Sequence, residues 1–192
     1  MKKFVNVCWI SFLLLAKPAF SQKDHLFKSI EKACSVPVDS VYRLDLSRNR
    51  FTEIPKKILQ FQQLRELNLS KNKLRNLPDN FIFPHLRVLD LSKNKLEVFP
   101  AVLCKNISIR HLFLGKNNIP EIPECIGSLQ DLIVLDIWFN PIDDLPTSLT
   151  KLRNLRSLDL SGLNFSKSFQ KKWTELLPWV KIEFDAACDC AD

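Results

Sequence analysis

Glycine and histidine are scarce in this sequence, and their scarcity excludes several classes of site. Only three Gly occur among 192 residues, and no two are close together, so neither a GxGxxG nor a GxxxxGK[ST] phosphate loop is present. The three His form no HExxH pair, which removes the usual signature of a zinc hydrolase. The sequence therefore indicates no nucleotide, no metal ion and no other cofactor.

Long hydrophobic runs are absent too. The longest uncharged run, Phe4–Ala16, has 13 residues, against the roughly 20 that cross a bilayer, so we expect no membrane span. The run follows Met1-Lys2-Lys3 and precedes Ala19-Phe20-Ser21, the pattern of a signal peptide with its cleavage point. Residues 1–21 are therefore predicted to be a signal peptide, and the protein to be secreted, periplasmic or at the cell surface; the alternative is a buried N-terminal helix or an uncleaved anchor.

Cysteine is uncommon and forms no CxxC pair, which argues against a redox motif or a zinc knuckle. Five Cys lie beyond the predicted signal peptide: Cys34, Cys104, Cys125, Cys188 and Cys190. An odd number in an exported protein leaves at least one thiol unpaired or joined to another chain. Neither their connectivity nor the oligomeric state follows from the sequence.

What the sequence has in abundance is a repeat. Five Asn residues mark it at a spacing of 22 or 23 residues: Asn49, Asn72, Asn94, Asn117 and Asn140. One further step of 23 reaches Leu163. Aligned on these positions, apolar residues fill the columns eight, five and three residues before the Asn and two, five and nine residues after it. A proline follows the column five residues after the Asn: Pro55, Pro78, Pro100, Pro123 and Pro146. Columns filled at one period indicate six stacked units.

These columns, for example Leu86–Pro100 with Leu89-Asp-Leu91 and Asn94, resemble the leucine-rich repeat family in its typical class of about 23 residues with an LxxLP motif. The resemblance covers about residues 41–165. It implies an α/β fold, a right-handed solenoid with a curved parallel β-sheet on the concave side and short 3₁₀ or turn segments on the convex side. It also implies a non-catalytic module that recognises a partner protein with the concave sheet.

Elementary physics supports the same arrangement. The alternation in Leu-Asp-Leu places successive side chains on opposite faces of a short strand, so that one face is buried. One repeat cannot bury its own apolar columns, whereas stacked repeats form a continuous core. An Asn side chain donates and accepts at once, so the Asn column is expected to satisfy backbone groups where the chain leaves each strand. Leu163 ends the column, and we expect this to be tolerated because no following repeat needs those bonds.

Terminal repeats would expose their core, so each end needs a cap. Residues 22–40 are predicted to form the N-terminal cap, with a helix over Asp24–Cys34, and residues 41–165 the six repeats. Residues 166–192 are predicted to form the C-terminal cap, with an amphipathic helix over Phe165–Leu177 and a last strand near Lys181–Phe184. These segments leave no catalytic domain, so we expect no enzyme activity.

The solvent-facing columns indicate where a partner binds. They are polar in the first three repeats, but the fourth and fifth introduce aromatic residues. Aromatic side chains grouped on an exposed face commonly anchor protein interfaces. The predicted partner-binding residues are Phe113, Trp138, Phe139, His111 and Asp136, with Gly115 leaving room for a partner to approach the backbone. The alternatives are that long neighbouring side chains cover the rings, or that the rings shield one another without a partner.

A second surface feature is a basic stripe beside the Asn column: Arg48, Arg50, Lys71, Lys73, Lys93, Lys95 and Lys116. With a net charge of +7, it offers an alternative function, adhesion to an anionic glycan or lipid surface. A solvated rim is the simpler interpretation, and nucleic acid is not an expected partner of an exported chain.

Four aspartates also align on the concave side: Asp45, Asp90, Asp136 and Asp159. Paired carboxylates can perform acid–base chemistry when a pocket raises the pKa of one of them. An open sheet provides no such pocket, so we expect neither a raised pKa nor a hydrolase.

Overall fold

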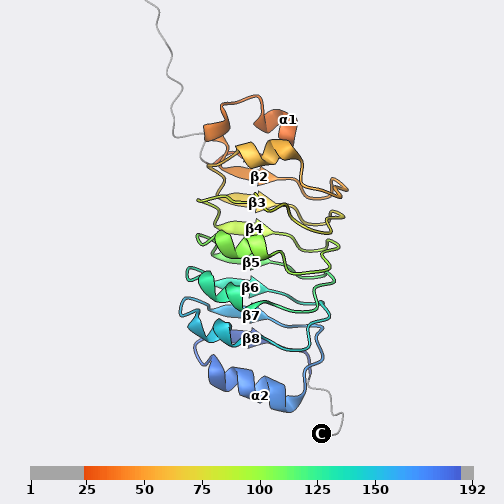
Figure 1. Ribbon diagram of the computed structural model, residues 1–192, viewed down its shortest axis with the longest axis vertical. Coiled ribbons are helices and arrows are strands. Elements are labelled where there is room, and N and C mark those ends of the chain that lie inside the picture. The colour runs from red at the N-terminus through yellow and green to blue at the C-terminus, as the bar shows by residue number, and fades with distance from the viewer. Residues whose placement is uncertain (1–23, 187–192) are drawn as a thin grey trace, which may run out of the picture.

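The computed structural model describes residues 24–186, and within them eight short strands form one parallel sheet. The strands lie side by side in sequence order: β1 (Leu26–Phe27), β2 (Arg43–Asp45), β3 (Glu66–Asn68), β4 (Val88–Asp90), β5 (His111–Phe113), β6 (Val134–Asp136), β7 (Ser157–Asp159) and β8 (Lys181–Glu183). Figure 1 shows them stacked along the long axis of the molecule. The predicted solenoid is confirmed; the predicted signal peptide, Cys188 and Cys190 lie outside the described residues.

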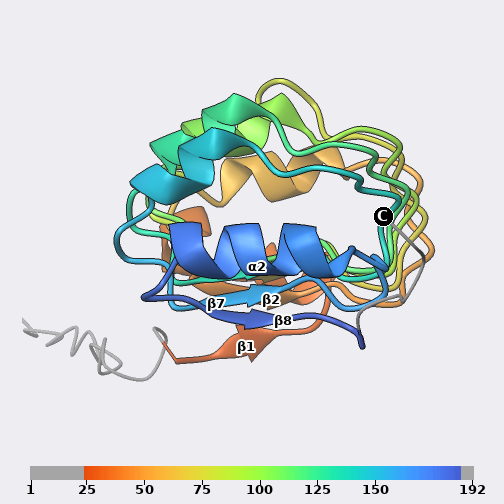
Figure 2. The same ribbon diagram turned by 90° about the horizontal axis from the view of Figure 1, so that it is seen from below.

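The convex layer consists of short 3₁₀ helices, as the proline column predicts. Apart from η1 (Val38–Ser40) in the N-terminal cap, they are η2 (Lys56–Gln60), η3 (Ala101–Lys105), η4 (Glu124–Ser128) and η5 (Thr147–Lys151). Each of these four begins directly after a proline, whose fixed φ and missing N–H suit the first turn of a helix. The segment after Pro78 contains turns instead. Figure 2 shows the sheet on one side of the molecule and the 3₁₀ helices on the other.

The core fills the space between these two layers. The sheet contributes the middle residue of each strand, such as Leu67 and Leu89, which pair in register and are buried. The convex layer contributes Ile58, Leu103 and Ile126 from successive 3₁₀ helices, and these are also buried. Because equivalent residues stack on one another, every apolar column continues from repeat to repeat.

The N-terminal cap differs from the prediction. The helix predicted over Asp24–Cys34 is wrong in its first half, because Leu26–Phe27 form β1 and α1 spans only Ile30–Ala33. β1 pairs with β2 and so supplies the backbone partners that an open sheet edge would lack. Ser29 then caps α1, its Oγ accepting from the Lys32 N–H at 3.2 Å.

The C-terminal cap has the predicted elements. α2 spans Lys167–Leu176, and the Ser166 Oγ caps it by accepting from the Phe169 N–H at 3.2 Å. Trp173 of α2 is fully buried against the last repeat, and β8 pairs with β7 at the end of the sheet. Figure 2 shows α2 lying across the end of the solenoid. No helix within residues 24–186 is long and apolar enough to traverse a bilayer.

Buried Asn side chains join consecutive repeats. Asn94 Nδ2 donates to the carbonyl oxygens of Leu69 (3.0 Å) in the preceding repeat and Leu91 (2.9 Å) in its own, while its Oδ1 accepts from the Leu74 N–H (3.1 Å). Three further residues make the same kind of contacts: Asn72, Asn117 and Asn140. Together these four form the Asn ladder, whose predicted structural role is confirmed.

The direction of the ladder corrects one expectation. Its hydrogen bonds run to the preceding repeat, so the position with no neighbour to serve is the first one and not Leu163. Asn49 accordingly is exposed, and within residues 24–186 its Nδ2 donates only to the Ser47 carbonyl of its own turn, at 3.0 Å. The stated reason for the loss of Asn at Leu163 is therefore wrong.

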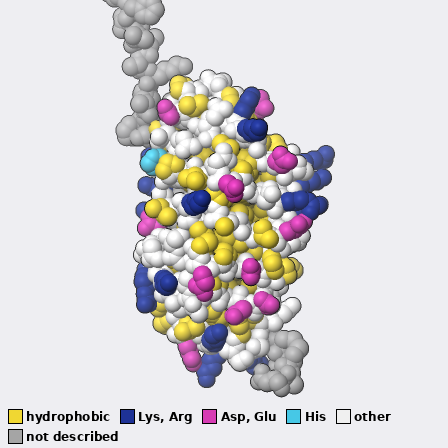
Figure 3. Space-filling view, viewed as in Figure 1, with side chains coloured by type: hydrophobic (Ala, Val, Ile, Leu, Met, Phe, Trp, Pro, Cys, Tyr) yellow, Lys and Arg dark blue, Asp and Glu magenta, His cyan; other side chains and the backbone are white. Residues whose placement is uncertain are grey.

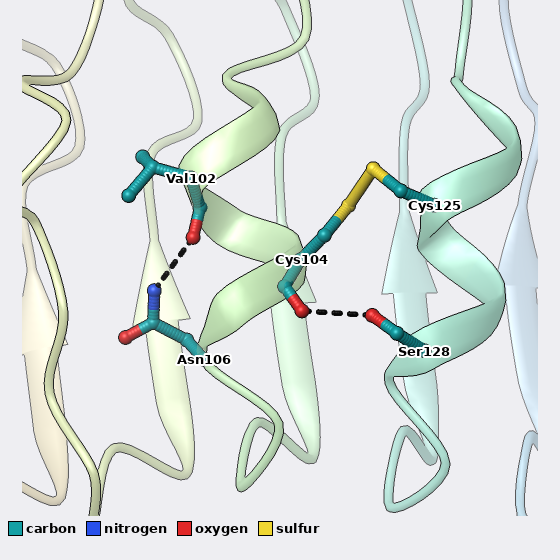
Figure 4. The surroundings of a disulfide bond; sticks show 5 residues. All are labelled: Val102, Cys104, Asn106, Cys125 and Ser128. Atoms are coloured by element: carbon teal, nitrogen blue, oxygen red, sulfur yellow. Dashed lines mark hydrogen bonds between the residues drawn. A yellow bond between two sulfur atoms is a disulfide. The ribbon is translucent and has the colours of Figure 1, made fainter.

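A disulfide also links two neighbouring turns of the convex layer. It joins Cys104 of η3 to Cys125 of η4, whose Cα atoms lie 5.8 Å apart, while Cys34 is free and exposed. The Ser128 Oγ donates to the Cys104 carbonyl at 2.7 Å between the same two turns (Figure 4). The sequence left this connectivity open.

Figure 4 also shows Asn106, a buried Asn outside the ladder. Its Nδ2 donates to the carbonyls of Val102 and Phe81, both at 3.0 Å, and its Oδ1 accepts from the Phe83 N–H at 2.8 Å. It thus satisfies backbone groups of the segment after Pro78, where turns take the place of a 3₁₀ helix.

Replacing Asn94 by Ala is expected to lower the free energy of unfolding by about 2 kcal/mol or more, because the Leu74 N–H and the carbonyls of Leu69 and Leu91 lose their partner. Asn49→Ala is the matched control and should change it by less than about 0.5 kcal/mol, since Asn49 bonds no neighbouring repeat. Urea denaturation of both variants measures the difference. Equal losses would contradict the structural role of the ladder.

Candidate functional site

Trp138 and Phe139 lie at the end of β6 where the chain leaves the sheet. Their rings meet edge to face with centroids 5.5 Å apart. Phe139 is 56% exposed, and Trp138 is half-buried. Phe113 of β5 is half-buried and lies beside Asp136 in the sheet, where it lines a shallow depression with Asp45 and Asp90. We call Phe113, Trp138 and Phe139 the aromatic patch.

Glycines of neighbouring repeats support both rings at the end of β6. A Cβ at Gly115 would lie 1.9 Å from Trp138 Nε1, and one at Gly162 would lie 2.4 Å from Phe139 Cδ2. The expectation that Gly115 leaves space for a partner is therefore wrong, because the indole of Trp138 already occupies that space. The two rings are instead fixed against the backbone of the repeats on either side.

The turn after each strand imposes a left-handed backbone conformation on the residue before the Asn position. Phe139 has φ 49°, and Lys116 and Lys93 have φ 55° and 57°. This region is unfavourable for a bulky side chain, but the Phe139 N–H donates to the Ser161 carbonyl of the next repeat at 2.8 Å and holds it there. The repeated turn thus projects one side chain per repeat toward solvent.

The basic stripe and the aromatic patch meet at Trp138. Lys116 Nζ lies 4.9 Å from the centroid of the Trp138 ring and 5.3 Å from that of Phe139, and Lys93 Nζ lies 5.8 Å from that of Trp138. Such distances allow cation–π attraction. All seven stripe residues are exposed, and none pairs with an acid within residues 24–186. Figure 3 shows Lys and Arg side chains projecting at the upper right, where Figure 1 places the loops after β2 and β3.

Asp136 differs from the other aspartates of its column. Asp45, Asp90 and Asp159 each accept at 2.9 Å from the backbone N–H two residues further on. The buried Oδ1 of Asp136 makes no hydrogen bond of normal geometry. Its burial, with smaller contributions from Asp159 and Asp90, raises the pKa of Asp136 to about 7, against the opposing effect of the Trp138 N–H groups. The expectation that no concave carboxylate has a raised pKa is therefore wrong.

The five predicted partner-binding residues do not form one cluster. His111 is half-buried at the other end of β5, where it lines a cleft with Arg65, Arg87 and Arg110. These arginines were not among the predicted site residues. The signal was present, because Arg stands seven residues before the Asn position in several repeats: Arg65, Arg87, Arg110 and Arg156. In the part of the chain that the structure describes, no group of three His, Cys, Asp or Glu residues is arranged to hold a metal ion.

Comparison with known proteins agrees with this architecture. The family profile described as "Leucine-rich repeat region" matches residues 78–171, and the one described as "Leucine rich repeat" matches residues 39–83. The chain is a leucine-rich repeat protein. That family and its fold are generally non-enzymatic and serve as protein-interaction modules.

Curated relatives resemble this leucine-rich repeat protein over part of their length. It is 39% identical over 118 residues to a leucine-rich repeat and calponin homology domain-containing protein of Drosophila melanogaster, covering 60% of this chain and 14% of that protein. It is 31% identical over 150 residues to the mouse leucine-rich repeat serine/threonine-protein kinase 1, covering 76% of this chain and 7% of the kinase. The chain thus spans about a seventh or less of these relatives.

Solved structures show the same solenoid. A leucine-rich repeat protein of Leptospira interrogans superposes with a TM-score of 0.64 at 28% identity, over 76% of this chain and 43% of that one. An internalin C2 of Listeria monocytogenes superposes with a TM-score of 0.66 at 19% identity, over 84% of this chain and 68% of that one. The second likeness shows the fold alone.

The raised pKa of Asp136 predicts a pH-dependent stability. Because the pKa is raised from 3.8 to about 7 on folding, protonated Asp136 favours the folded state. That contribution is complete below about pH 4 and is lost as the pH rises through about 7. After allowance for solvent screening of this partly exposed group, we expect a loss of about 1 kcal/mol.

Asp136→Asn should remove this loss and be more stable than the wild type at about pH 8. Asn suits the position because Asn68 occupies the same column, where its Oδ1 accepts from the Ser70 N–H at 2.9 Å. Urea denaturation across the pH range, with Asp90→Asn as the control, measures the effect. If both variants keep the pH profile of the wild type, the assignment to Asp136 fails.

Proposed function

We propose that this protein is a non-catalytic recognition module that binds a partner protein with its concave sheet. The observation that carries the proposal is the aromatic patch, because its exposed ring at Phe139 contacts Trp138 at positions that are polar in the first three repeats. In the first three repeats, Asp or Asn stands at the position of Phe113, Ser at that of Trp138 and Arg or Lys at that of Phe139. Membership of a family whose proteins generally bind proteins supports the same function.

The packing of the patch suits it to binding. The rings of Trp138 and Phe139 are fixed on glycine backbone before a partner arrives, so binding orders few side chains. Aromatic residues that are rigid and partly exposed are the usual anchors of interfaces. Lys116 and Lys93 stand beside Trp138 and favour a partner whose apolar contact is bordered by acidic groups.

We also propose that the protein acts outside the cytoplasm, as a secreted, periplasmic or surface molecule. The disulfide between Cys104 and Cys125 supports this compartment, because such bonds form and persist mainly in oxidising environments. The basic start and short apolar run of residues 1–16 support it independently.

Adhesion to an anionic glycan or lipid surface is the second candidate function. The exposed basic stripe, which pairs with no acid within residues 24–186, favours it. Ionic adhesion weakens steeply as salt rises, whereas contact through aromatic anchors changes little, so salt dependence separates the two functions.

Trp138→Ala is expected to weaken partner binding by about 2 kcal/mol, or about thirty-fold, because it removes an anchor from the centre of the patch. The partner is first identified by crosslinking in extracellular material, and its affinity for each variant is then measured by calorimetry. Val98→Ala is the control, since Val98 is 58% exposed and lies outside the patch. Unchanged affinity in Trp138→Ala would refute the proposed site.

Cys104→Ser with Cys125→Ser is expected to lower the free energy of unfolding by about 3 kcal/mol, because the bond closes a loop of some twenty residues. Mass spectrometry of the exported chain should find the linked peptide pair. A chain recovered from the medium with both thiols reduced would contradict the proposed oxidising compartment.

A further inference from the structure

A cleft of about 420 Å³ lies at the ends of the strands opposite to the Asn ladder. It is lined by arginines of four consecutive repeats: Arg43, Arg65, Arg87 and Arg110. The lining is completed by His111, Asp24, Glu66 and Val88. We call it the arginine cleft. None of the seven residues of the basic stripe lines this cleft. It is therefore a separate positive surface, at the N-terminal ends of the strands.

The backbone sets the spacing of these arginines. The Arg87 N–H donates to the Arg65 carbonyl, and the Arg110 N–H donates to the Arg87 carbonyl, both at 2.8 Å. Consecutive arginines therefore follow one another at the distance between parallel strands, about 4.8 Å. Stacked like charges repel one another, so the column costs stability unless an anion lies beside it.

The arginines of the cleft differ in the contacts that their guanidinium groups make. Arg43 is paired, because its Nε donates to Glu66 Oε2 at 2.7 Å, and Arg65 stacks over Tyr42 with its Cζ 5.2 Å from the ring centroid. Arg87 and Arg110 are exposed, and their guanidinium groups make no hydrogen bond or ion pair within residues 24–186. Two adjacent guanidinium groups are thus available to a ligand.

The positive groove continues past the arginine cleft. Arg110 also lines a second cleft of about 290 Å³, with Asp131, Ile133, Asn154 and Arg156. Because Arg110 lines both clefts, they adjoin each other along the N-terminal ends of the strands. A ligand that follows this edge is therefore a linear polymer rather than a single small anion.

We propose that the arginine cleft binds a linear sulfated polysaccharide, with Arg87 and Arg110 as its principal contacts. A guanidinium group presents a planar fork of N–H donors that matches two oxygens of one tetrahedral oxyanion. An extended acidic peptide fits less well, because side chains on one of its faces recur about every 6.8 Å and not at the strand spacing. His111 and Asn154 add polar groups for the hydroxyls of a sugar.

Heparin serves as the sulfated probe, and its affinity for the full chain is measured by calorimetry at about 0.15 M salt. Arg87→Gln with Arg110→Gln should weaken binding at least about ten-fold. The matched control, Lys57→Gln with Lys105→Gln, removes the same charge from exposed residues of η2 and η3, outside both the cleft and the basic stripe, and should change it less than about three-fold. Arg87→Lys with Arg110→Lys keeps the charge but loses the fork, and should still bind about three-fold or more weakly.

Desulfated heparin and polyglutamate separate the alternatives. Weak binding of both, beside tight binding of heparin, supports the proposal. It is overturned if polyglutamate binds as tightly as heparin, which indicates an acidic peptide, or if both Gln double variants lose affinity equally, which indicates net charge alone. Absence of heparin binding by the wild type at this salt concentration also overturns it. None of these outcomes depends on the aromatic patch, so the proposed protein-binding function is tested separately.

Discussion

The structure depends on the hydrogen bonds that each buried Asn side chain makes to two consecutive repeats. One amide at Asn94 satisfies the carbonyls of Leu69 and Leu91 and the N–H of Leu74, all in a turn closed to water. Leaving such groups unpaired would cost more than most apolar contacts in the core supply. The ladder therefore fixes the register in which the repeats stack, and with it the positions of all side chains on the sheet.

The same turn also determines the surface. Its left-handed residue projects a lysine or arginine in the first four repeats and Phe139 in the fifth. One backbone conformation therefore produces the exposed aromatic ring and four residues of the basic stripe: Arg48, Lys71, Lys93 and Lys116. At the opposite end of the strands, the paired backbone of Arg65, Arg87 and Arg110 produces the arginine cleft in the same way. The surfaces at the two ends of the strands, and the concave face between them, therefore all follow from the stacking of one repeated unit.

The sequence predicted the features that recur in every repeat. Leu67 and Leu89 occupy a column whose period alone implies burial, and Asn94 occupies one whose chemistry implies paired backbone groups. It did not predict features that occur once. β1 is a strand because β2 offers it an edge, and the partner of Cys104 depends on how two convex turns face each other. Neither fact is contained in a single repeat.

The candidate site shows the same limit. Their positions in the repeat predicted that Trp138 and Phe139 lie together. They did not predict that the two rings pack on Gly115 and Gly162 or that Asp136 is buried beside Trp138, because these features depend on side-chain direction. His111 shares a strand with Phe113 yet lines the arginine cleft, since the two lie at opposite ends of that strand.

The proposed recognition surface lies on the concave face where the chain leaves β5 and β6. Hydrogen exchange of the chain, alone and bound to its partner protein, locates that surface. We expect new protection of the backbone N–H groups in residues 113–116 and 136–139, with no change in η3 and η4 on the convex side. Protection confined to η3 and η4, with exchange at 113–116 and 136–139 unchanged, would contradict this proposal.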